Sequence, residues 1–94
     1  MATWVVYHLI HVRVPHQRIP KLVITGVPDG ETVTKELLEQ AGFLFGEFGV
    51  PWANHGIIQL GPDAPSDLVG RARDPHVPRI TWTDLLAQAN APVE

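Results

Sequence analysis

Three of the five histidines in this sequence of 94 residues lie close together, at positions 8, 11 and 16. Imidazole nitrogens bind metals and transfer protons, so this cluster is the first candidate for a chemical site. Residues 3–14 are rich in β-branched and aromatic side chains and therefore predict a strand. On a strand His8 and His11 point to opposite faces, and His16 follows a proline, so the three imidazoles do not converge. We expect no metal site and no cofactor.

His8 is the most informative of the three because it interrupts an apolar face. The even positions of the predicted strand include Trp4, Val6 and Ile10, and they form the better core face. A buried imidazole needs a hydrogen-bond partner. His8 is therefore either a satisfied core histidine or a proton-transferring group that lines a pocket.

A second candidate site is the loop Trp52-Ala-Asn-His-Gly56. An aromatic ring, an amide, an imidazole and a glycine in one loop can enclose a ligand and hydrogen-bond it. The alternative is that Trp52 closes the end of the core while Asn54 and Gly56 form a turn. We take Trp52, Asn54 and His55 as candidate binding residues, and His8 or His55 as the candidate catalytic residue if the protein is an enzyme.

Motifs for nucleophilic or nucleotide chemistry are missing from the sequence. It contains no cysteine and no Gly-x-Ser-x-Gly element, and Ser66 and Thr81 are better explained as helix caps. The stretch Gly26-Val-Pro-Asp-Gly30 precedes a predicted helix, but it lacks the dinucleotide-binding fingerprint and carries an acidic residue. An enzyme would therefore have to be a small acid/base catalyst without a cofactor.

Composition restricts the partners. Seven Lys and Arg residues stand against ten Asp and Glu residues, which gives a formal charge of −3 and argues against nucleic-acid binding. The apolar run over residues 4–10 is too short and too polar for a signal peptide or a membrane span. We expect a cytoplasmic protein that binds neither nucleic acid nor membrane.

The pattern of elements predicts a single α+β domain over residues 1–94. Strands over 3–14 and 21–25 form a hairpin with His8 opposite Gly26, and residues 57–60 add a short third strand. Apolar residues at three- and four-residue steps predict one long amphipathic helix over 32–48. We expect a two-layer sandwich in which this helix covers the small antiparallel sheet, followed by an irregular proline-rich segment over 61–80 and a short C-terminal helix.

Several aromatic and apolar residues fall outside this predicted core. Phe43 lies off the apolar face of the predicted helix, and Tyr7 and Leu9 share the odd face of the first strand, with His11 at its polar end. The odd face is covered either by the proline-rich segment or by another chain, and exposed apolar patches often mark interfaces.

We therefore expect a small non-enzymatic interaction protein, such as an adaptor, accessory subunit or inhibitor encoded by a phage or mobile element. It would act through a protein partner or as a homodimer, because a two-fold contact is the commonest assembly. The alternative is an isomerase-, cyclase- or dehydratase-type enzyme that uses a pocket histidine.

Overall fold

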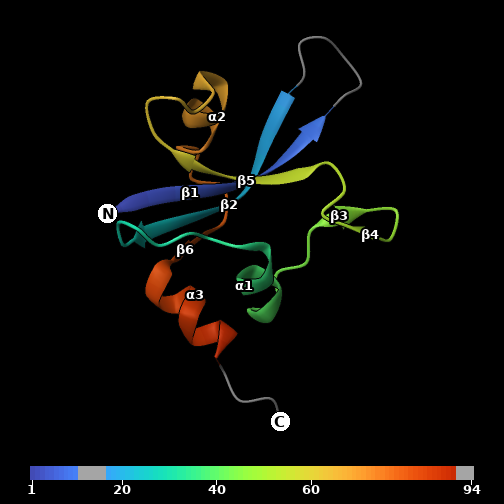
Figure 1. The fold of residues 1–94 in the computed structure, drawn as a ribbon. Coiled ribbons are helices and arrows are strands. Elements are labelled where there is room, and N and C mark those ends of the chain that lie inside the picture. Colours follow the sequence, from blue (N-terminus) through green and yellow to red (C-terminus); the bar gives the residue numbers. More distant parts are fainter. Residues whose placement is uncertain (11–16, 91–94) are drawn as a thin grey trace.

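The computed structural model describes residues 1–10 and 17–90 as a sheet-rich α+β fold (Figure 1). The elements in chain order are β1 (Ala2–Ile10), β2 (Gln17–Val27), α1 (Lys35–Gln40), β3 (Gly46–Glu47), β4 (Val50–Pro51), β5 (His55–Leu60), α2 (Ser66–Arg71), β6 (Arg79–Thr81) and α3 (Trp82–Ala89).

The main sheet has the strand order β5-β1-β2-β6, in which β1 pairs antiparallel with both β2 and β5, and β6 pairs parallel with β2. The predicted N-terminal hairpin and its third strand are present. The predicted register is wrong, because His8 lies opposite Ile19 and not Gly26. The second strand begins at Gln17, earlier than expected, and the pairing shifts between Val6 and Tyr7.

Both faces of β1 and β2 are buried. Val6 and Ile24 belong to the cluster that packs with α1 and α3, whereas Val5 and Val23 pack with Leu68 of α2 on the other face. Figure 1 shows α2 on one side of the sheet and α1 with α3 on the other. The predicted two-layer sandwich is therefore wrong, because short helices cover the sheet from two sides.

The predicted long helix over 32–48 is wrong because α1 ends at Gln40, and Gly42 follows its C-cap residue Ala41. This glycine has a φ of +92°, and its N–H donates to the Glu39 carbonyl at 3.0 Å. The Phe43 N–H donates to the Leu38 carbonyl at 2.9 Å. These two bonds form a Schellman motif, which satisfies the last carbonyls and turns the chain away from the helix axis. Phe43 folds back against the core instead of standing off it.

Residues beyond this stop form a small β-hairpin from β3 and β4. Its turn consists of Phe48 and Gly49, with φ values of +52° and +75°, as a type I′ turn requires. Gly46 permits the strands to approach, since a Cβ there would lie 2.3 Å from the Val50 carbonyl oxygen. The apolar residues of this segment therefore serve a hairpin and not a helical face.

The helices are short and locally capped. The Thr34 hydroxyl accepts the Leu37 N–H at 3.1 Å, and the Thr81 hydroxyl accepts the Asp84 N–H at 3.1 Å, as the sequence predicts for Thr81. Ser66 is not a cap, because Pro65 occupies the N-cap position of α2. Across residues 1–10 and 17–90, no helix combines the length and apolar character needed to cross a membrane.

We predict opposite effects of alanine at two exposed glycines that both leave open space for a Cβ. Gly42→Ala should lower the free energy of unfolding by about 1 kcal/mol, because its left-handed backbone disfavours a side chain. Gly70→Ala, the matched control inside α2, should raise it by up to about 1 kcal/mol. Urea unfolding measures both. Stabilisation by Gly42→Ala would show that the helix continues past this point.

Candidate functional site

The site is built on a pair of stacked imidazoles. His8 of β1 and His55 of β5 are register partners, so their side chains leave the same face of the sheet. Their ring centroids lie 4.6 Å apart with an interplanar angle of 10°. The structure thus places side by side the two histidines that the sequence suggests as alternative catalytic residues, although 47 positions separate them in the chain.

Glu47 of β3 completes the cluster. Its Oε1 lies 2.5 Å from His8 Nε2, and its Oε2 accepts a hydrogen bond of 2.7 Å from Asn54 Nδ2. The His8 and Glu47 side chains are 21% and 26% exposed. Both carboxylate oxygens therefore have a donor in a half-buried setting, which fixes the orientation of the His8 ring.

These contacts lower the pKa of Glu47 below its ordinary value. The hydrogen bond from Asn54 is the largest cause, and the hydrogen bond and charge of His8, with a smaller contribution from His55, act in the same direction against the opposing effect of burial. Each contact favours the ionised form. Glu47 is thus an acceptor at neutral pH and can orient or stabilise an imidazolium.

The loop between β4 and β5 sets the second imidazole. His55 Nδ1 lies 2.7 Å from the Ala53 carbonyl oxygen, which can only accept, so Nδ1 carries a proton. Trp52 and Asn54 hold left-handed φ values of +63° and +58° in this turn. In the neutral ring, Nε2 of His55 therefore keeps its lone pair and can act as a base.

Trp52 links this loop to α1. Its indole Nε1 donates to Glu39 Oε1 at 2.8 Å, and Lys35 Nζ lies 5.5 Å from a ring centroid. The Phe45 ring is a neighbour of both the indole and the His55 ring, with centroid distances of 5.5 Å and 5.9 Å. Trp52 also packs against the core, so it both closes the core and forms an aromatic wall beside the imidazoles.

The remaining candidate binding residues do not join this cluster. Tyr7 lies over Gly56 on the opposite face of the sheet, where a Cβ at position 56 would be 2.6 Å from its hydroxyl oxygen. Leu9 contributes its N–H to the Asn54 carbonyl at 2.7 Å. His11 lies outside the described residues. Val5 of the same odd face is fully buried and packs with Leu68 of α2, whereas Tyr7 and Leu9 are half-buried.

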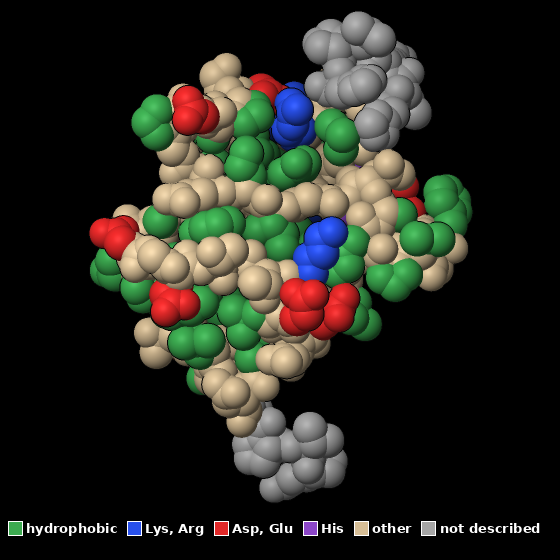
Figure 2. Space-filling view, in the orientation of Figure 1, with side chains coloured by type: hydrophobic (Ala, Val, Ile, Leu, Met, Phe, Trp, Pro, Cys, Tyr) green, Lys and Arg blue, Asp and Glu red, His purple; other side chains and the backbone are tan. Residues whose placement is uncertain are grey.

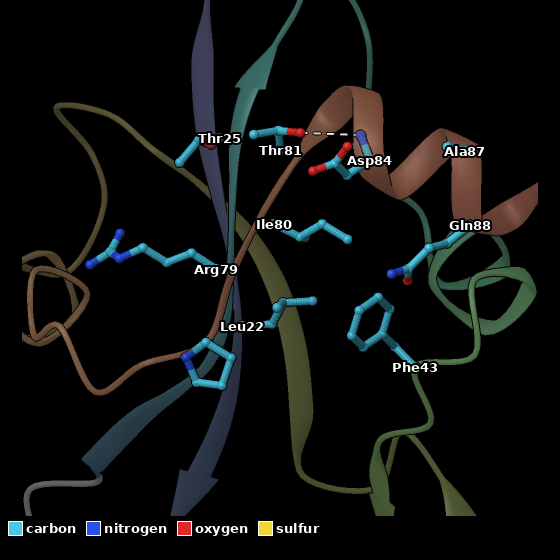
Figure 3. Close-up of a pocket in the computed structure, with 10 residues that line it drawn as sticks. Leu22, Thr25, Phe43, Arg79, Ile80, Thr81, Asp84, Ala87 and Gln88 are labelled. Carbon is cyan, nitrogen blue, oxygen red and sulfur yellow. Dashed lines mark hydrogen bonds between the residues drawn. The ribbon is translucent and has the colours of Figure 1, made fainter.

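Phe43 lines a different pocket, between β6, β2 and α3 (Figure 3). This pocket of about 570 Å³ has a floor of Leu22, Phe43 and Ile80. Its one cationic residue, Arg79, points away from it in Figure 3 and donates to the carbonyl groups of Ala72 and Asp74. Arg79 thus anchors the segment after α2, and the other polar residues that line the pocket are Thr25, Thr81, Asp84 and Gln88.

The β3–β4 hairpin carries a hydrophobic surface that the sequence analysis missed. We define the hairpin patch as the residues Leu44, Phe48 and Val50, which are 82%, 99% and 56% exposed. Figure 2 shows hydrophobic side chains gathered over this hairpin, at the right of the molecule. The patch borders a groove of about 540 Å³ that also includes Glu39 and Glu47. The sequence feature that could have indicated this turn is Phe48-Gly49, a glycine-containing pair between two short apolar runs.

Comparison of the chain with protein families, curated proteins and solved structures finds no match.

We predict that Glu47 makes stability depend on acid pH. The pKa of Glu47 in the folded protein lies below its ordinary value of 4.5. Ionised Glu47 therefore stabilises the folded protein at pH values above about 4.5, and this stabilisation is lost as the pH falls through the lowered pKa. Glu47→Gln should therefore differ most from wild type at neutral pH and converge with it in acid. Urea unfolding across this pH range, with the exposed Glu31→Gln as control, measures the effect. A constant offset between wild type and Glu47→Gln would contradict the assignment.

Proposed function

We propose that this protein works by binding another protein through the hairpin patch. Phe48 carries the proposal. Its φ of +52° lies in the left-handed region, which is uncommon for residues other than glycine, asparagine and aspartate, and the residue is 99% exposed. The ring gains nothing from packing, and the backbone would accept asparagine more readily. Contact with a partner is the physical role that accounts for an aromatic side chain here.

The groove beside the patch indicates the chemistry of that partner. Its two ionisable lining residues, Glu39 and Glu47, are both acidic, and each carboxylate is already held by a hydrogen bond. An apolar side chain flanked by lysine or arginine on the partner would match this surface. The same carboxylates repel nucleic acids and anionic lipids, so a protein partner fits better than either. We place the interaction in the cytoplasm, where a chain without cysteine needs no oxidising environment.

A second candidate function is acid/base catalysis at the imidazole pair. The observation that favours it is the Glu47 carboxylate at 2.5 Å from His8, since a base oriented by a carboxylate is a recurring catalytic arrangement. Small molecules that shift the imidazole NMR signals of His8 and His55 would support this candidate. A partner that binds at the hairpin patch without shifting them would favour the interaction.

We predict that Phe48→Asn separates binding from folding. Asn-Gly is a preferred pair for this turn, so the variant should gain about 1 kcal/mol of stability while it loses the exposed ring. In affinity capture from the native host, wild type should retain a partner in stoichiometric amount that Phe48→Asn does not retain. Capture should also weaken with added salt, because the groove is acidic.

Glu36→Gln is the control for this experiment, because it changes an exposed carboxylate of α1 outside the groove lining. It should capture the partner as wild type does. Equal capture by Phe48→Asn, or no partner with wild type, would contradict the proposed function.

A further inference from the structure

The outer edge of β5 is a second surface, separate from the hairpin patch. β5 is the last strand in the order β5-β1-β2-β6, and within residues 1–10 and 17–90 no strand pairs with its outer side. Its six residues, His-Gly-Ile-Ile-Gln-Leu, include no charge and no proline. Its register with β1 runs without a bulge. Charges, prolines and bulges are the features that normally keep sheet edges from pairing, and β5 has none of them.

The opposite edge of the sheet is protected in the usual ways. β6 has only three residues, follows Pro78 and begins with the charged Arg79. A short edge with a proline and a charge offers little backbone for pairing. The contrast singles out β5 as the edge that is built to accept another strand.

The phase of the β1–β5 ladder shows which backbone groups point outward. The Leu9 N–H donates to the Asn54 carbonyl, so Leu9 and Asn54 form a hydrogen-bonded pair of the antiparallel ladder. Antiparallel pairs alternate, and the backbone groups of residues 55, 57 and 59 therefore face away from β1. The His55 N–H bonds to the Trp52 carbonyl, which leaves the outward N–H groups of Ile57 and Gln59 for a partner strand.

Apolar side chains flank this edge on both faces. Ile57 packs with the cluster beneath α1 and α3, and Ile58 packs with the cluster beneath α2, and both are only half-buried. Figure 2 views the molecule onto this edge, and a band of backbone and polar atoms along β5 has hydrophobic side chains above and below it. An added strand would extend the sheet and both apolar layers at once.

We propose that a second copy of this chain binds here, with β5 antiparallel to β5 of the partner and Ile57 opposite the partner subunit's Ile57. This register sets His55 opposite the partner's Gln59, so the free N–H groups of Ile57 and Gln59 each face a carbonyl group of the partner strand, while the His55 N–H keeps its bond to the Trp52 carbonyl. Because β5 contains no Lys, Arg, Asp or Glu and this register sets His55 opposite the partner's Gln59, no two charged residues of like sign face each other, and β-branched residues meet at the two-fold axis. The two four-stranded sheets become one continuous sheet.

The test compares two substitutions at the exposed Gln59. Gln59→Pro removes an outward N–H that β1 does not use, whereas Gln59→Thr removes the same side chain and keeps the N–H. Size exclusion with light scattering should give wild type and Gln59→Thr twice the chain mass of 10.4 kDa, and Gln59→Pro the single mass. Circular dichroism confirms folding. If Gln59→Pro unfolds, Gln59→Lys replaces it, since its charge blocks the same edge.

Hydrogen exchange locates the contact. The amides of Ile57 and Gln59 should exchange slowly in concentrated wild type and faster on dilution, and Phe48→Asn should remain dimeric because the hairpin patch is not involved. Wild type at the single mass from micromolar to millimolar concentration would overturn the proposal. A folded Gln59→Pro that stays dimeric, or a dimer without concentration-dependent protection at these amides, would overturn it as well.

Discussion

Burial of both faces of one strand is the constraint on which the rest of the structure depends. Val5 and Val6 are neighbours in β1, so their side chains point to opposite faces, and both are fully buried. Each face therefore needs its own cover. A chain of this size meets that need with short helices on two sides, since it lacks the residues for one long helix and a second layer as well.

The candidate site follows from the same arrangement. β1 is central in the sheet and places His8 beside the register partner His55 of β5. The turn that ends α1 at Gly42 releases the chain into the β3–β4 hairpin, which brings Glu47 back to His8. The hairpin thus has two roles, because it supplies the carboxylate of the imidazole cluster and presents Phe48 at its tip. An acidic group and an exposed ring therefore belong to one small element.

Much of the sheet and the C-terminal helix could be predicted from the sequence, whereas the end of α1 and the hairpin that follows it could not. β-branched residues identified β1 and the strand at 57–60, and threonine spacing identified the cap at Thr81. The prediction of one helix over 32–48 failed because the apolar residues there, at three- and four-residue steps, are compatible both with a long helix and with a short helix followed by a hairpin. Gly42 and Phe48-Gly49 decided between them through backbone conformation. Glu47 escaped notice because a helix would have placed it on the solvent face, away from His8.

Binding through the hairpin patch is the central functional claim, and a hydrogen-exchange footprint of the protein with its captured partner tests it most directly. We predict that partner binding slows amide exchange over residues 44–50 and leaves exchange in α2 and α3 unchanged. A footprint confined to α3 and β6, around the pocket that Phe43 lines, or one that leaves residues 44–50 unchanged, would contradict it.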